Sequence, residues 1–321
     1  MLDKKEIKQK SEKMKKIIKI IKVAAVCTLA ICVLSINTVF AAAKTSSAQF
    51  LLLGAGARNV AMGQSGVVGS QSSSDMYWNP ATLTQVETKQ ATLMHASWLA
   101  DTSYEWASYA QPLKGGSIGL AVQYLNYGSI KSYDTTGLAT GELNPNAMAV
   151  SVGYAKNINT KLAVGASAKY ISSKLNNSAT AMAIDAGLVY AILPDKAKVG
   201  LSVANLGTKL KYLEDEENLP QNIKLGGNYN ITKNLNTILD FNMPTYADAY
   251  FGIGAEYMIV AIANTQLAFR AGYNSQNTNT KGTTNLSAGF GISYKNYSFD
   301  YAFLPYGDIG NANLISFSVK F

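Results

Sequence analysis

The stretch NLSAGFGISYKNYSFDYAFLPYGDIGNANLISFSVKF, residues 285–321, decides the fold because its apolar residues recur at every second position. In its last segment Ile315, Phe317, Val319 and Phe321 share one face, and polar residues occupy the other. A period of two places successive side chains on opposite faces of a β-strand. Asn, Gly, Pro and Asp, which favour turns, separate the segments. The stretch therefore predicts three strands, each with one apolar face.

The same alternation extends back along the chain to about residue 88. Most segments are about 10 residues long, the length that a tilted strand needs to cross a bilayer. No run of 18 or more apolar residues follows Ala43, so no spanning helix is expected after it. We predict an all-β fold, a 14-stranded antiparallel transmembrane β-barrel over residues 88–321 with an N-terminal hatch. The predicted strands are 88–98, 102–111, 116–127, 146–156, 161–173, 179–192, 197–206, 221–231, 234–243, 248–258, 264–273, 284–294, 297–304 and 312–321.

Charged residues of these segments follow the alternation. Each falls on the less apolar face of its segment, which in a barrel is the lumen, because a charge facing lipid costs a few kcal/mol at mid-depth. A soluble β-sandwich also alternates and is the alternative fold. The predicted lumen charges are Glu105, Lys169, Asp185, Lys224, Asp240, Glu256, Arg270 and Asp300.

The predicted connections also favour an outer-membrane barrel. Six are short, and the intervening ones include long connections at 128–145, 207–220, 274–283 and 305–311. Short periplasmic turns and long outer loops are typical of outer-membrane barrels. The short connection near 99–101 departs from this rule. The final aromatic, with Phe317 and Val319 before Phe321, resembles the signal that barrel-assembly machinery recognises.

Most of the +8 net charge lies before Val23, where nine lysines accompany three acidic residues, so the remainder of the chain is near neutral. This distribution gives no support for a nucleic-acid partner. The segment up to Ala43 has the basic, apolar and small-residue order of a cleaved secretory signal peptide, with an uncleaved anchor as the alternative. We predict translation from Met14, a signal peptide over 1–43 and export to the bacterial outer membrane, with contact to its lipid.

Residues 44–87 are rich in Gly and Ser and do not form a predicted strand pair. A flexible linker is the alternative, but it would leave the apolar residues near Phe50 and Trp78 without packing partners. We predict a compact hatch inside the barrel, where small residues permit close packing against the wall and an Asn-Pro step favours a turn. The candidate hatch residues are Arg58, Met62, Gly63, Trp78, Asn79 and Pro80.

The hatch sequence, from QFLLL at 49–53 through GAR, AMG and MYWNPA at 76–81, resembles the N-terminal signature of the PorV/PorQ family. The Asn-Pro-Ala element is shared with the related FadL-type fatty-acid transporters. The resemblance is specific over about 45 residues and architectural beyond them. It implies a fourteen-stranded barrel with a hatch, which agrees with the strand count made without it.

Two functions remain open, and neither is catalytic. The resemblance implies type IX secretion, with a secretion translocon and secreted cargo as partners at the outer loops. The alternative is FadL-like transport of a hydrophobic small-molecule ligand, gated by the hatch. No cofactor is predicted. The body of the protein lacks Cys and has one histidine, His95, on a face that the sequence leaves ambiguous. The acidic run 214–217 lacks the spacing of a calcium loop and favours a solvated loop.

Overall fold

A computed structural model describes residues 46–99, 101–212, 214–260, 265–277 and 284–321. The predicted signal peptide and the predicted start at Met14 lie outside these residues. Among the described residues, no helix combines the length and hydropathy that a membrane crossing requires.

Fourteen antiparallel strands form a closed barrel in which β1 pairs with both β2 and the last strand, β18. Closure runs from Gln90 opposite Lys320 to Ser97 opposite Asn313. A closed sheet leaves no unpaired edge, which is why a barrel can cross lipid. The strands are β1 (Gln90–Ser97), β2 (Ser103–Leu113), β3 (Gly116–Asn126), β6 (Asn146–Asn157), β7 (Leu162–Lys174), β8 (Ser178–Leu193), β9 (Ala197–Gly207), β12 (Asn222–Asn230), β13 (Leu235–Pro244), β14 (Tyr250–Val260), β15 (Thr265–Asn274), β16 (Leu286–Tyr294), β17 (Tyr297–Pro305) and β18 (Asn311–Lys320).

The predicted fold class and strand number are confirmed. Each predicted segment overlaps one barrel strand, and the ends differ by a few residues at most. Burial alternates along β1, β6 and β18, so one face of each strand is covered by the interior and the other is exposed. The exposed side chains of the barrel face are apolar at most positions, as a lipid-facing surface requires.

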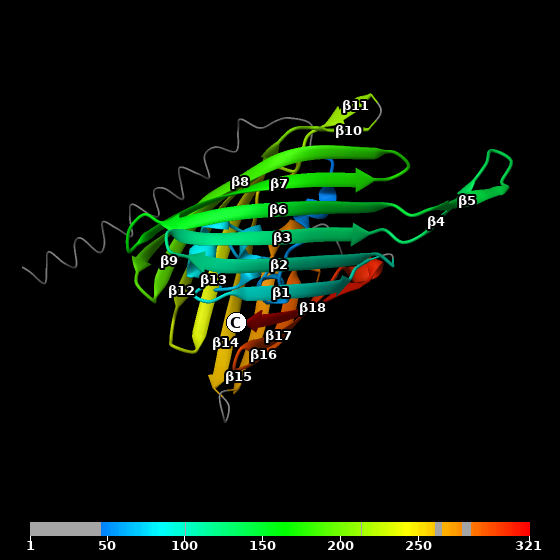
Figure 1. The fold of residues 1–321 in the computed structure, drawn as a ribbon. Helices are drawn as coiled ribbons and strands as arrows, with labels where there is room; N and C mark the ends of the chain where they lie inside the picture. The colour runs from blue at the N-terminus through cyan, green and yellow to red at the C-terminus, as the bar shows by residue number, and fades with distance from the viewer. Residues whose placement is uncertain (1–45, 100, 213, 261–264, 278–283) are drawn as a thin grey trace, which may run out of the picture. The chain divides into compact units, whose positions relative to one another are not determined.

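Two long connections contain short hairpins that the sequence pattern did not predict. Strands β4 (Ile130–Tyr133) and β5 (Ala139–Leu143) pair between β3 and β6, and they continue beyond the ends of those strands (Figure 1). Strands β10 (Leu210–Tyr212) and β11 (Asp215–Glu217) pair between β9 and β12. Each hairpin was predicted as loop because its residues are mostly polar.

We call the end with the long connections the outer end and the opposite end the periplasmic end, following the loop asymmetry of outer-membrane barrels. The C-terminus lies at the periplasmic end, where the Phe321 amide donates to the Lys89 carbonyl. The first described residues lie at the outer end, where the Ser47 amide donates to the Asn218 carbonyl at 3.0 Å. The hatch therefore runs from the outer mouth to the periplasmic start of β1.

Four short helices make up the hatch, and they pack against the inner wall of the barrel (Figure 1). The α-helix α2 contacts β15 to β18, while the last 3-10 helix contacts β6, β7 and β8 on another part of the wall. Frequent glycines and turns keep each helix to one or two turns. The elements are η2 (Gln49–Leu52), α2 (Ala57–Ala61), η3 (Ser73–Tyr77) and η4 (Pro80–Gln85).

Candidate functional site

The hatch and the wall residues that hold it form the candidate site. At Gly63 the backbone has a φ of 71°, and an added β-carbon would lie 2.5 Å from the Tyr273 carbonyl oxygen of β15. The Gly63 carbonyl accepts a hydrogen bond from the Asn274 side chain at 3.1 Å. Only glycine fits this conformation and this contact, since other residues pay a backbone cost and meet the wall. Met62, the residue before Gly63, is buried against β14 and β15.

Arg58 joins the hatch to a row of charges on the wall. Its Nε donates to Glu256 Oε2 at 2.7 Å, and Arg270 Nε donates to the same oxygen at 2.7 Å. Arg270 Nη1 in turn reaches Asp300 Oδ1 at 2.7 Å. Two guanidinium groups and two carboxylates therefore alternate from the hatch along this part of the inner wall. Removing one member of such a buried network leaves an uncompensated charge, which costs more than the intact pair contributes.

The carboxylate of Asp240 on β13 binds the backbone of a hatch loop. Its Oδ2 accepts from the Gly66 amide at 2.6 Å and from the Val67 amide at 3.0 Å. These hydrogen bonds are charge-assisted, which makes them stronger than those between neutral groups. The carboxylate is buried, so the two amides replace water at Oδ2, while Oδ1 has no hydrogen-bond partner among the described residues.

The Trp78-Asn79-Pro80 step ties two hatch segments to the opposite wall. Asn79 Nδ2 donates to the Val67 carbonyl at 2.8 Å and to the Leu188 carbonyl at 3.1 Å. Its Oδ1 accepts from the Ala81 amide at 3.0 Å and caps η4, where Pro80 occupies the first helical turn. Proline suits this position because its missing N–H would have no helical partner. Trp78 Nε1 donates to the Ala55 carbonyl at 2.9 Å.

Asp75 organises the hatch internally. Its Oδ2 accepts from the Ser70 and Ser72 amides at 2.5 and 2.9 Å, and its Oδ1 accepts from Asn59 Nδ2 at 3.1 Å. Ser72 and Asp75 form a reciprocal capping box at the start of η3. A buried, fully hydrogen-bonded carboxylate thus fixes the fold of a segment that has little regular structure.

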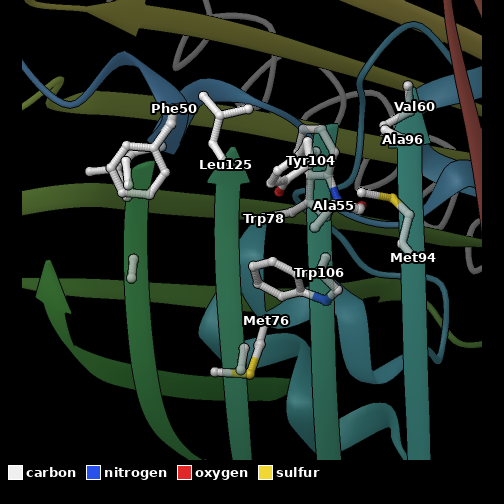
Figure 2. Close-up of a cluster of buried hydrophobic side chains, with 14 of the residues drawn as sticks. Phe50, Ala55, Val60, Met76, Trp78, Met94, Ala96, Tyr104, Trp106 and Leu125 are labelled. Atoms are coloured by element: carbon white, nitrogen blue, oxygen red, sulfur yellow. Dashed lines mark hydrogen bonds between the residues drawn. The ribbon is translucent and has the colours of Figure 1, made fainter. Parts of the chain in front are cut away.

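The wall formed by β1, β2 and β3 meets the hatch with apolar groups. Tyr104, Trp106 and Leu125 point inward beside Phe50 and Trp78 of the hatch, as Figure 2 shows. Two wall side chains also bond the hatch backbone: Tyr104 Oη donates to the Leu53 carbonyl at 3.1 Å, and Gln123 Nε2 donates to the Phe50 carbonyl at 2.7 Å.

Aromatic contacts continue into the hatch. The Tyr77 ring meets Trp106 edge-on, with centroids 5.7 Å apart. Burial raises the pKa of Tyr77 well above its ordinary value, so its hydroxyl stays protonated and donates to the Leu51 carbonyl at 3.0 Å.

A second group of charges lies on β7, β8 and β12. Lys169 Nζ lies 3.1 Å from Asp185 Oδ2 and donates to Asn205 Oδ1 at 2.7 Å. Lys224 Nζ lies 5.2 Å from the centres of both the Tyr77 and Trp78 rings. A desolvated cation over an aromatic face is stabilised by the ring quadrupole, so this lysine packs against the hatch.

Seven of the eight predicted lumen charges face the interior, and Glu105 does not. Glu105 and His95 lie on the outer face, where their side chains are 43% and 52% exposed and Nδ1 lies 2.7 Å from Oε1. The prediction for Glu105 is wrong because it took the less apolar face of β2 as the lumen. Tyr104 and Trp106 make the inward face of β2 the apolar one, since the hatch is apolar there.

The predicted assembly signal lies at the end of β18. Phe317 and Phe321 are exposed, and Val319 is half-buried on the same outer face. The signalling role of these three residues stays a prediction.

Two cavities that differ in volume border the hatch. A polar cavity of about 410 Å³ lies toward the periplasmic end, lined by Arg58, Lys198 and Lys320 among others. Toward the outer end, a pocket of about 20 Å³ lies between Leu51, Lys224 and Tyr250. The outer pocket is about the size of one water molecule.

The sequence did not predict several polar residues that hold the hatch in place. Asn59, Asp75, Gln85 and Gln123 make hatch contacts, but isolated polar residues in a Gly- and Ser-rich stretch or on a strand carry no spacing signal. In the acidic loop, Glu216 pairs with Lys209 at 3.7 Å. Among the described residues, no three His, Cys, Asp or Glu side chains gather in a metal-binding arrangement.

A family model described as type IX secretion system protein PorV matches residues 38–243, which include the described hatch and strands β1 to β13. No individual curated sequence matches the chain.

Solved structures resemble the barrel in fold. The toluene transporter TbuX of Ralstonia pickettii gives a TM-score of 0.59 at 17% identity, over 83% of this chain and 98% of that chain. The toluene transporter TodX of Pseudomonas putida gives 0.60 at 12% identity, over 82% and 97%. A FadL homologue of Pseudomonas aeruginosa gives 0.53 at 9% identity, over 83% and 97%. Both fold and family are those of secretion or transport barrels of the bacterial outer membrane.

Proposed function

The chain belongs to the family of type IX secretion system protein PorV, and from this premise we propose that it is a docking barrel of a type IX-like secretion system. In this role it binds the translocon and secreted cargo at its outer end, and the hatch stays seated while it does so. The barrel contributes position and surface, and it carries out no chemical step.

The observation that carries the proposal is the β4–β5 hairpin at the outer end. Ile130, Tyr133 and Leu138 are 50%, 58% and 69% exposed on it. An isolated two-stranded hairpin is marginal in water, and its free edges and apolar side chains are suited to a protein partner. A partner that adds a strand to either edge would complete the hairpin's hydrogen bonds.

The hatch contacts support a seated hatch. Charge pairs, backbone hydrogen bonds and apolar packing hold it against several parts of the described wall, and one pocket beside it toward the outer end measures about 20 Å³. A docking barrel needs no passage through this region, whereas a transporter would have to displace the hatch.

The first test changes the hairpin alone. A triple variant, Ile130→Ser with Tyr133→Ser and Leu138→Ser, should lose co-purification with the translocon from detergent-solubilised outer membranes and should lose cargo display on the cell surface. Lys131→Gln, an exposed change on the same hairpin, is the matched control and should retain both. Unchanged co-purification in the triple variant would contradict the proposal, as would a genome that encodes no type IX translocon.

Transport of a hydrophobic small molecule is the second candidate. Its support is the fold likeness to solved proteins that are named toluene transporters. In this case Arg58, Trp78, Asn79 and Pro80 would gate the lumen. Uptake of a radiolabelled aromatic hydrocarbon by proteoliposomes, at a rate above that of liposomes without the protein, would favour this candidate over docking.

A further inference from the structure

The lipid-facing side of β18, β1, β2 and β3 carries a polar pair in an otherwise apolar surface. His95 and Glu105 are directly opposite each other on β1 and β2, and His95 Nδ1 lies 2.7 Å from Glu105 Oε1. The other described ion pairs of the spanning strands face the lumen. Charged side chains on the lipid face of a barrel cost least near the bilayer interfaces, so the pair indicates a position near one of them.

Strand register arranges the neighbours of this pair in two rows. The row nearer the outer end is Ile315, His95, Glu105 and Tyr124. One pleat toward the periplasm, the second row is Phe317, Leu93, Ala107 and Val122. The polar pair therefore lies at the centre of the first row, immediately above the apolar second row.

The small side chain of Ala107 leaves a depression in the second row. Its volume is about 370 Å³, and its lining includes Leu93, Val122 and Phe317, with His95 and Glu105 at the outer rim. The surface is thus concave and apolar on the side toward the membrane centre and offers hydrogen-bonding groups on the side toward the outer surface.

The polar rim lies near the outer ends of its two strands. His95 is two residues from the outer end of β1, and Glu105 is two residues from the outer end of β2. Tyr124, opposite Glu105, has the amphipathic ring that gathers at membrane interfaces. In a bilayer whose outer boundary follows the outer strand ends, acyl chains end and the polar groups of lipids begin near this row.

We propose that these two rows bind an amphiphile of the outer leaflet. One acyl chain fills the depression over Ala107, and a hydroxyl or amide at the chain's polar end bonds to the His95–Glu105 pair. Glu105 accepts a hydrogen bond from that donor, while His95 contacts Glu105 through Nδ1 and the Ser97 hydroxyl, 3.5 Å away, through Nε2. The order of groups along the site, apolar toward the membrane centre and polar toward the surface, is that of a lipid in the outer leaflet. This inference does not depend on the proposed secretion role.

Two neutral lipids with the same acyl chain, each added from detergent micelles, test the polar rim. N-tetradecanoylethanolamine has an amide and a hydroxyl, and methyl tetradecanoate has no donor. Native mass spectrometry of the full chain should show the first bound about tenfold more tightly, because one hydrogen bond to a charged group is worth about 1.4 kcal/mol or more. The double variant His95→Leu with Glu105→Leu should lose this preference.

A second variant tests the depression independently of the rim. Ala107→Leu should weaken binding of both probes, whereas Ile253→Ala, an exposed position on the outer face of β14, should leave both unchanged. Heat-modifiable mobility on gels confirms that each variant is folded. Equal affinity for the two probes in the unmodified chain would overturn the proposal, and so would unchanged binding in Ala107→Leu.

A photoreactive residue at Val122 in living cells tests the occupant itself. A lipid adduct supports the proposal. A cross-link to another protein would overturn it and assign this face to a protein contact in the membrane.

Discussion

Two parts of the inner wall hold the same hatch by different chemistry. The wall of β13 to β17 uses charge: Asp240, Glu256, Arg270 and Asp300 meet hatch amides, the hatch guanidinium or one another. The wall of β1 to β3 uses mainly apolar packing by Tyr104, Trp106 and Leu125, together with hydrogen bonds from uncharged groups. We call these the charged wall and the apolar wall. The comparison shows that the polarity of a strand's inward face matches the hatch residues that it contacts. The lumen is therefore not polar throughout.

The largest expected effect is on the charged wall. Glu256→Gln leaves Arg58 without its carboxylate partner in a buried site, so we expect the free energy of unfolding to fall by about 3–5 kcal/mol. Chemical unfolding of the protein in detergent micelles measures this change. Lys156→Gln, an exposed charge at the periplasmic end of β6, is the control and should change stability by less than about 0.5 kcal/mol. Equal stability of the two variants would contradict the charged anchor.

A substitution in the apolar wall should lower the free energy of unfolding by less than one in the charged wall. Leu125→Ala removes a buried side chain beside Phe50, and we expect a loss of about 3 kcal/mol in the free energy of unfolding from lost burial and the cavity that remains. Leu120→Ala on the same strand faces outward and should cost clearly less, since lipid can fill the space. If both substitutions cost the same, the hatch does not pack against this wall.

Adding a methyl group to a wall glycine that contacts the hatch should reduce stability by a smaller amount. Gly272→Ala places a β-carbon against the Gly63 amide, so the hatch must shift, at a cost of about 1–3 kcal/mol. Limited proteolysis should then cut the hatch faster than in the unmodified protein. Gly227→Ala, where the nearest atom to an added β-carbon is 3.4 Å away, provides the matched change. Identical proteolysis of both variants would show that the Gly63 contact does not hold the hatch.

The smallest effect is expected on the outer face of the barrel. Replacing His95 and Glu105 together by leucine should change the free energy of unfolding by less than about 1 kcal/mol, because charges near the membrane interface cost little. The same unfolding assay checks this value. A loss as large as that of Glu256→Gln would mean that the outer pair stabilises the barrel as the charged wall does.

The sequence predicted the barrel well because a strand buried on one face repeats every two residues. It predicted the lumen charges of the charged wall for the same reason. The prediction failed at Glu105 because inward aromatic residues and outward polar ones reverse the usual contrast on β2. Hatch contacts such as Arg58 with Glu256, which are 198 residues apart, follow from the folded arrangement and leave no local pattern. The β4–β5 hairpin was missed because its polar residues resemble an ordinary loop.

One measurement tests the central claim that the barrel acts with its hatch seated. Ser73 Oγ of the hatch lies 3.0 Å from Ser108 Oγ of β2, so Ser73→Cys with Ser108→Cys can form a disulfide, whose sulfurs are about 2.0 Å apart. The two native cysteines, Cys27 and Cys32, lie in the predicted signal peptide, so the pair would have no competing thiol in the mature chain. Cargo display on the cell surface is then compared with the lock oxidised and reduced. We predict display at the unmodified level in both states; display that is lost on oxidation and returns on reduction would contradict the account.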